Sequence, residues 1–316
     1  PPRQCSRQSL QRYWLHFAGS ASTMSVLRST SALKSHALLL IVSAAGFAAL
    51  GWPLVAPAHT ATAATATSSI LSLIVLPLTV ALFVNEIVVR HLSTKTLAVA
   101  GILIALAAAV RPLGAGVAGI EPMWLILIVA GRVLGSATGF VIGVSAIFAS
   151  ALVTGGIGPW LPAQLVAAGW VAMGAGLLPR AKGRTEVTLL ALYAAVATFL
   201  FGWVMNLWFW QSLTGLQSAI AFDPAEPAME RVLAWVRYNL TTSLGFDLPR
   251  AAFTAALVAV AGLPLLNTLR RANRSFSVTP AAAAAMRTAG GGEGEAPAPE
   301  TEEAKRAAAE AALRAK

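Results

Sequence analysis

The sequence PMWLILIVAGRVLGSATGFVIGVSAIFASALVTGGIGPWLPAQLVAAGWVAMGAGLL, residues 122–178, decides the fold class of this chain. It contains a single charged residue, Arg132, and is otherwise almost wholly apolar. Apolar runs of this length are typical of segments that lie in lipid. Glycines recur four residues apart, at positions 131, 135, 139 and 143, and this spacing lets the backbones of two membrane helices approach closely. The stretch therefore predicts the core of an all-α polytopic membrane protein.

The composition of the whole chain indicates the same class. Of its 316 residues, 57% are hydrophobic and 11% are charged, whereas soluble domains carry about 25% charged residues. A net charge of +10 would suggest nucleic acid in a soluble protein. Here the Lys and Arg residues stand at the ends of apolar runs, as the positive-inside rule requires. We therefore expect the lipid bilayer as a partner, and no nucleic acid.

Eight apolar segments predict about eight membrane-spanning helices. They are residues 37–56, 69–90, 96–112, 122–132, 135–153, 161–178, 187–210 and 251–270. A spanning helix needs about 20 residues. The short segment 122–132 is therefore expected either to tilt together with its flanks or to break between Gly131 and Gly135.

The charges of the loops predict that both termini are cytoplasmic. With the N-terminus inside, the loops on the inner side carry Arg90 and Lys95, then Arg132, then the basic run 180–184. The loops 57–68 and 154–160 contain no Lys or Arg, and this topology places both of them outside. The exception is Arg111, which falls at the outer end of a helix.

Segments outside the apolar helices differ in character. Residues 1–36 are basic and are expected to be cytoplasmic; Met24 opens MSVLRSTSALKSH like a natural start, so residues 1–23 are expected to be upstream, non-native sequence. Residues 275–316 are rich in Ala, Gly, Glu and Pro and predict a disordered cytoplasmic tail.

The segment 211–250 is the largest predicted structure on the outer side. Val232, Leu233, Val236 and Leu240 recur in it at helical spacing and predict an amphipathic helix at 228–243, lying on the outer surface. Such a helix is either a lid over a substrate site or a connection packed on the surface.

Several kinds of chemistry are absent from the sequence. The single cysteine, Cys5, allows no intramolecular disulfide and no Cys-based metal cluster. The four histidines do not stand at ligand spacings, and no HExxH, GxSxG or Walker sequence occurs. We therefore expect no catalytic residue, no metal site and no cofactor, and the chain cannot hydrolyse ATP through a P-loop.

Polar and aromatic residues near the predicted outer boundary are the candidates for binding a substrate. They are Arg111, Glu121, Trp124, Trp160, Gln164, Asn206 and Trp210. An aromatic wall with a few polar anchors is typical of small-molecule sites. Two structural readings stay open: Arg111 and Glu121 form an ion pair that staples their loop, and the tryptophans form an interfacial belt.

A stripe of small residues marks the helix predicted at 96–112. Gly101, Ala105 and Ala109 lie four apart on one face, which allows another helix to pack at short distance. That helix belongs either to the same bundle or to a partner protein. Arg132 has a similar pair of readings, as a topological signal or as a contact with a partner.

Two motifs resemble those of a known family. The run G-R-V-x-G-x-x-x-G-F-x-x-G at 131–143 continues into T-G-G-x-G-P-W at 154–160 and a helix from Gln164 to Gly176. This pattern resembles the substrate-binding S component of energy-coupling factor (ECF) transporters, particularly cobalamin-type and uncharacterised actinobacterial members. RPLGAGVAGIE at 111–121 and FGWVMNLWFW at 201–210 are also similar, and the resemblance covers residues 94–272.

The resemblance implies a six-helix membrane domain at 94–272, with two additional spans at 37–90. It implies a plasma-membrane protein that binds a vitamin or related micronutrient, with cobalamin the leading candidate, and that works with a T component and two ATPases. It favours partner docking through Gly101, Ala105 and Ala109. It places ligand contacts in 111–124, 154–164 and 206–246.

Two other classes of protein remain as alternatives. A membrane-integral enzyme acting on lipid-linked substrates is disfavoured because the sequence has no DDxxD-like carboxylate cluster and no His/Asp dyad at a membrane face. An envelope assembly protein would have no ligand-sized pocket on its outer side.

Overall fold

A computed structural model describes residues 37–55, 94–114, 119–213 and 218–275 of this chain, and single positions at 77, 80, 81 and 84. The chain divides into two compact units, 1–273 and 274–316. Only residues 274–275 of the second unit are described, as the end of a helix. The predicted span 69–90, apart from those single positions, the basic segment 1–36 and the tail lie outside the described residues.

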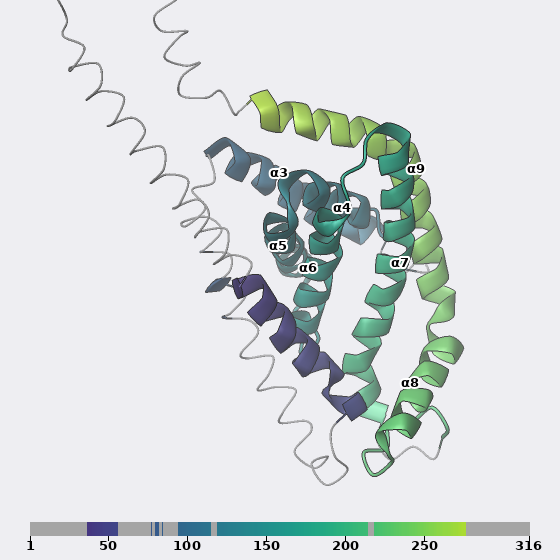
Figure 1. Ribbon diagram of the computed structural model, residues 1–316. Coiled ribbons are helices and arrows are strands. Elements are labelled where there is room, and N and C mark those ends of the chain that lie inside the picture. Colours follow the sequence, from purple (N-terminus) through teal and green to yellow (C-terminus); the bar gives the residue numbers. More distant parts are fainter. Residues whose placement is uncertain are drawn as a thin grey trace, which may run out of the picture. The chain divides into compact units, whose positions relative to one another are not determined.

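The described residues form helices joined by short turns (Figure 1). The first helix is Ala37–Val55. It is followed by α3 (Thr94–Val110), η2 (Arg111–Gly114), α4 (Met123–Leu134), α5 (Ser136–Thr154), α6 (Leu161–Leu177), α7 (Gly183–Trp210), η3 (Gln211–Leu213), α8 (Ala228–Thr242) and α9 (Leu244–Ser275). The predicted all-α class is confirmed.

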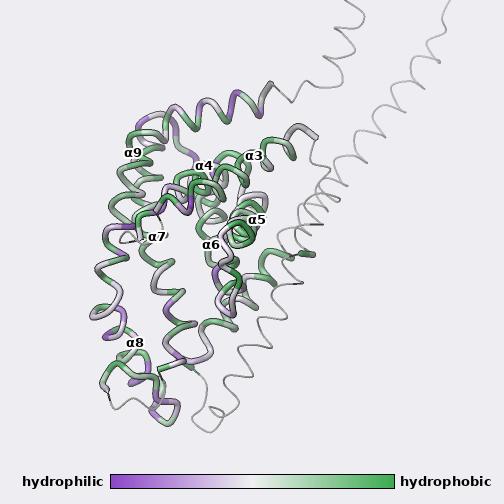
Figure 2. The backbone as a smooth tube through the Cα atoms, turned by 180° about the vertical axis from the view of Figure 1, so that it is seen from behind, coloured by the Kyte–Doolittle hydropathy of each residue, from purple (hydrophilic) through white to green (hydrophobic). Residues whose placement is uncertain are grey.

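Five of these helices are long and apolar enough to cross a membrane. They are Ala37–Val55, Thr96–Gly114, Ser136–Thr154, Gly183–Leu213 and Leu244–Asn273, and α4 and α6 are shorter apolar helices. Figure 2 shows hydrophobic residues along these helices and more hydrophilic ones in α8 and near the last turns of α9. The count of eight spans and the cytoplasmic location of both termini remain predictions.

Helix α4 breaks where the sequence predicted. It has 12 residues, so it is about 18 Å long and shorter than the roughly 30 Å hydrocarbon layer. Gly135 ends it with φ of 94°, in a region of backbone conformation that favours glycine. The chain then enters α5 at Ser136. Gly135 therefore makes the turn, and a Cβ added there would meet nothing within 4 Å.

The other three glycines of the series bring α4, α5 and α6 into close contact. Gly131 and Gly139 lie against the backbone of Ala172, and a Cβ at Gly143 would lie 2.6 Å from the carbonyl oxygen of Ala168. A side chain at these positions would push the helices apart. The predicted role of glycine in close helix packing holds at 131, 139 and 143, but not at 135.

The helix Ala37–Val55 packs on the same core through α6. The indole nitrogen of Trp170 donates a hydrogen bond to Ser43 Oγ at 3.1 Å. The ring of Phe47 stacks on Trp170 with the two centroids 4.2 Å apart, and Val42 is fully buried. This helix, expected as an addition to a six-helix domain, therefore contributes side chains to the core of the bundle.

Candidate functional site

Arg111 and Glu121 meet at the end of the bundle that is predicted to face outward. Arg111 lies in η2, and Glu121 precedes α4. The distance from Arg111 Nε to Glu121 Oε1 is 3.6 Å, and Arg111 Nη1 donates to Ser150 Oγ at 3.4 Å. Both distances are longer than those of strong hydrogen bonds. The ion pair considered as a loop staple is present, and it is a loose one.

A second ion pair, which the sequence analysis missed, lies beside the first. Arg250 Nη1 donates to Asp247 Oδ1 at 2.7 Å, and Ser243 Oγ donates to Asp247 Oδ2 at 2.7 Å. Asp247 is almost fully buried. The spacing of three residues at the start of a helix is typical of such a pair. The spacing of Asp247 and Arg250 could have indicated this ion pair in the sequence, but the helix was expected to begin only at residue 251.

The loop before α4 connects these two ion pairs. A Cβ at Gly119 would lie 2.9 Å from Arg250 Nη2, so the loop backbone passes directly over the guanidinium group. The Arg250 guanidinium lies 5.6 Å from the centre of the Phe201 ring, a distance typical of a cation–π contact. We call Arg111, Glu121, Asp247 and Arg250 the Arg111 cluster.

Burial raises the pKa of the Glu121 carboxyl group, and the positive charges of Arg111 and then Arg250 oppose this rise. With all four groups ionised, the Arg111 cluster is formally neutral. Protonation of Glu121 leaves one excess positive charge. The cluster is therefore suited to receive an anionic group or a strong hydrogen-bond acceptor of a substrate.

Trp124 borders the Arg111 cluster from α4. It is fully buried, and its ring meets Phe201 edge to face at 4.5 Å. Of the predicted substrate residues, the structure therefore brings Arg111, Glu121 and Trp124 together. The contact through Phe201 also joins them to α7.

Asn206 and Trp210 belong to a different group of contacts, at the end of α7. Asn206 Nδ2 donates to Asn239 Oδ1 of α8 at 2.8 Å. The Trp210 indole donates to the carbonyl oxygen of Ile220 at 2.8 Å, and the Trp210 ring meets Phe222 at 5.0 Å. These two predicted residues connect α7 to α8 and to the turn before it.

Trp160 and Gln164 stand at the start of α6. Trp160 is 40% exposed, and its ring meets that of Trp208 edge to face with the centroids 6.1 Å apart. Gln164 is partly buried in the first turn of α6. The seven predicted substrate residues are thus distributed over the Arg111 cluster, the contact between α7 and α8, and the start of α6.

Two tryptophans that the sequence analysis did not single out lie between α7 and α8. Trp203 and Trp235 meet edge to face at 5.3 Å. Their indole nitrogens are buried and have no hydrogen-bond partner among the described residues. A buried donor without an acceptor is costly, so both N–H groups favour contact with a hydrogen-bond acceptor.

The small-residue stripe of α3 faces away from the described core. Gly101, Ala105 and Ala109 are exposed, and a Cβ at Gly101 would meet nothing within 4 Å. The opposite side of the helix, with Ala100 and Ala107, is buried. Among the described residues, the stripe therefore does not serve internal packing.

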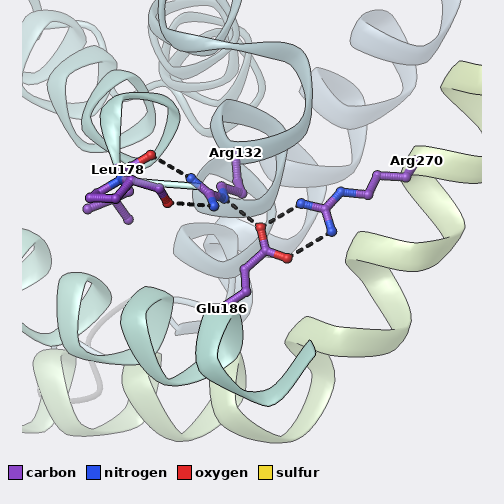
Figure 3. A network of polar contacts seen from close by, with 5 residues as sticks. Arg132, Leu178, Glu186 and Arg270 are labelled. Atoms are coloured by element: carbon purple, nitrogen blue, oxygen red, sulfur yellow. Dashed lines mark hydrogen bonds and ion pairs between the residues drawn. The ribbon is translucent and has the colours of Figure 1, made fainter. Parts of the chain in front are cut away.

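Arg132 lies in a buried network at the other end of the bundle (Figure 3). Its Nε donates to Glu186 Oε1 at 2.7 Å, and its two terminal nitrogens donate to the carbonyl oxygens of Leu178 and Pro179. Arg270 Nη1 donates to Glu186 Oε2 at 2.8 Å. The hydrogen bonds of Arg132 are made within the chain, which argues against its reading as a contact with a partner.

The bundle and its five long apolar helices define a multi-pass protein of the plasma membrane. Residues 95–262, more than half of the chain, match the family model of the substrate-specific component of ECF transporters. The chain therefore belongs to this family, and the S-component resemblance is confirmed. No curated protein and no solved structure gives a significant match.

Membership of the family defines the general role of the chain. Family members are substrate-binding transport components and are not themselves enzymes, and they interact with T and ATPase components and with a small-molecule substrate. The cobalamin-type subgroup remains a prediction.

Proposed function

We propose that this protein captures a vitamin or a related micronutrient on the outer side of the membrane and delivers it with a T component and two ATPases. The observation that supports this proposal most is the Arg111 cluster. Ionisable groups at the boundary of a membrane bundle are costly and typically mark a functional site. The family match favours a transport component over a membrane enzyme or an envelope assembly protein.

The chemistry of the described residues restricts the substrate. Among the described residues, Arg111 makes only long contacts, at 3.4 and 3.6 Å, and its guanidinium has donors that suit a carboxylate, phosphate or amide oxygen of a ligand. Trp203 and Trp235 supply aromatic faces, and their indole donors have no acceptor in the described part of the chain. These features favour a ligand with an extended, partly apolar body and several acceptor oxygens. Cobalamin, which carries peripheral amides and a phosphodiester, remains our first candidate.

The partner surface that we propose is the stripe of Gly101, Ala105 and Ala109. The exposure of these residues on α3 supports docking of a helix from the T component, since small side chains allow close approach. Toppling of the S component against the T component would then release the ligand inward. ATP hydrolysis by the partners supplies the energy, because this sequence contains no Walker motif.

Ligand identification tests the proposed function directly. The protein is purified from its native membrane, and molecules that co-purify are identified by mass spectrometry. Binding of a vitamin panel, with cobalamin first, is then measured by tryptophan fluorescence, for which the chain offers nine tryptophans. We expect one member of the panel to bind at nanomolar to low micromolar concentration. Absence of any bound vitamin or precursor, together with absence of a co-purifying ATPase module, would overturn the proposal.

A further inference from the structure

The side of α8 that packs on the bundle is not its aliphatic side. Its buried residues are Arg231, Tyr238 and Asn239, and Asn239 is hydrogen-bonded to Asn206 of α7. The amphipathic pattern alone would place apolar residues against the protein. In this helix, polar and aromatic side chains occupy that place.

The apolar residues of α8 form a stripe on another side of the helix. Met229 is 68% exposed, Leu240 48% and Leu233 39%, and Val236 is partly buried. With 100° between successive residues, these four positions fall within an arc of about 60°. We call them the α8 stripe. It is an apolar surface that the described residues leave largely exposed, above all at Met229 and Leu240.

A third side of α8 is hydrophilic. Glu230, Arg237 and Thr241 are exposed and fall together on the flank between the α8 stripe and Ala234. The helix thus has three sectors, one buried on the bundle, one apolar and exposed, and one polar and exposed. A helix that lies at a membrane surface and packs against a protein needs these three sectors.

The connection to α9 holds α8 close to the membrane. Only Ser243 separates Thr242 from Leu244, and the Ser243 and Asp247 amides bond to the carbonyl oxygens of Asn239 and Ser243. Helix α9 is long and apolar enough to cross the bilayer. Phe246 and Leu248, in its first turns, are also apolar and exposed. Helix α8 therefore ends where an apolar helix long enough to span the bilayer begins.

We propose that α8 is an interfacial helix whose stripe of Met229, Leu233, Val236 and Leu240 lies among the acyl chains of the adjacent leaflet. Glu230, Arg237 and Thr241 then face the headgroups and water. The lipid holds α8 from one side, while Asn206 and the buried aromatic rings hold it from the other. The occupant of the stripe is lipid, and neither a second copy of the chain nor a partner protein is needed to cover it.

Site-directed spin labelling tests this placement. Cys5 is the only cysteine, so Cys5→Ser provides a background for Leu233→Cys and Leu240→Cys, with Thr241→Cys as the matched control on the polar flank. Each full-length variant is labelled with a nitroxide and reconstituted without partners into phosphatidylcholine–phosphatidylglycerol vesicles. Collision with oxygen reports acyl chains, and collision with a nickel–ethylenediaminediacetate complex reports water.

We expect the ratio of oxygen to nickel accessibility to be several-fold higher at positions 233 and 240 than at 241. Equal nickel accessibility at all three positions would place the stripe in water and overturn the proposal. Shielding of 233 and 240 from both reagents would show that protein covers the stripe, and this also overturns it. Circular dichroism of each variant verifies folding, and the two stripe positions provide independent readings. The measurement needs no substrate and no ATPase, so its outcome is separate from that of the proposed function.

Discussion

Arg132 of α4 donates a hydrogen bond to Glu186 of α7 at 2.7 Å, across 54 positions of sequence. Glu186 is fully buried, and Arg270 of α9 occupies its remaining carboxylate oxygen. One carboxylate thus joins three helices at the end of the bundle that is predicted to be cytoplasmic. A rigid connection here would let the bundle move as one body when it tilts in the membrane.

Replacing Glu186 with glutamine is expected to destabilise the fold, because two arginines lose their shared counter-charge. Removal of one partner of a buried ion pair costs about 3–5 kcal/mol. Equilibrium unfolding in mixed micelles measures the loss. Glu226→Gln, at an exposed position, is the control and should change the free energy of unfolding by less than about 0.5 kcal/mol. Equal effects of the two substitutions would show that the network does not stabilise the bundle.

Two glycine-to-alanine substitutions distinguish the effect of close helix packing on stability from the effect of helix propensity. Gly143→Ala places a Cβ 2.6 Å from the Ala168 carbonyl oxygen, and overpacking of this kind typically costs about 1–3 kcal/mol. Gly101→Ala meets nothing within 4 Å and should be neutral or stabilising by up to about 1 kcal/mol. Unfolding midpoints of the two variants provide the comparison, and a stable Gly143→Ala protein would contradict close packing of α5 on α6.

Arg111→Gln is expected to weaken substrate binding without unfolding the protein. Loss of a charge-assisted hydrogen bond of about 1.5–3 kcal/mol corresponds to roughly 10- to 100-fold in Kd. The matched control is Arg184→Gln, at an exposed position at the opposite end of the bundle. Titration with the identified vitamin gives both constants. Unchanged affinity in Arg111→Gln would limit the Arg111–Glu121 contact to a structural role.

Ala105→Leu is expected to abolish uptake and to preserve substrate binding, because a larger side chain prevents close approach of a partner helix. Ala256→Leu adds the same volume on the exposed side of α9 and should leave uptake intact. Vitamin uptake by cells and ligand binding by purified protein are measured for both. Parallel loss of uptake and binding in Ala105→Leu would instead indicate that the stripe packs within the protein.

The raised pKa of Glu121 makes the free energy of unfolding depend on pH. Burial raises this pKa above its ordinary value of 4.5, so between the two values the folded protein binds more protons than the unfolded chain. The stabilisation of the folded state that Glu121 contributes is therefore fully present below pH 4.5. It is lost as the pH rises through the pKa that Glu121 has in the folded protein. Glu121→Gln should remove this dependence, which appears as a difference between the unfolding temperatures of the two proteins as pH rises. Parallel pH profiles would contradict the shift.

The apolar periodicity of the chain predicted most of its helices correctly, because hydropathy over about 20 residues is a local property. The segments 135–153 and 161–178 correspond closely to α5 and α6. Helix α9 is the main difference, because it begins at Leu244 and not near 251, and it contains Pro249 and Pro264. Its first turns carry Asp247 and a proline, and local composition therefore argued for a loop. Hydrogen bonds from Ser243 and Arg250 stabilise that carboxylate in the folded bundle.

The candidate site was predictable only in part. Arg111 and Glu121 are ten residues apart and flank one turn, so their proximity follows from the chain connection. Asp247 and Arg250 come from the far end of the sequence and reach the same place only because α9 packs beside α7 against Gly202. No local pattern carries that information.

Membrane class, helical content and the S-component family follow from the sequence alone, because they depend on local composition and on motifs within one or two helices. The partners of Arg132, the side of α8 that faces the bundle and the different partners of Asn206 and Arg111 were decided by the tertiary structure. These features depend on the relative rotation of helices around their axes. That rotation is set by the summed packing of all neighbours, and no single segment encodes it.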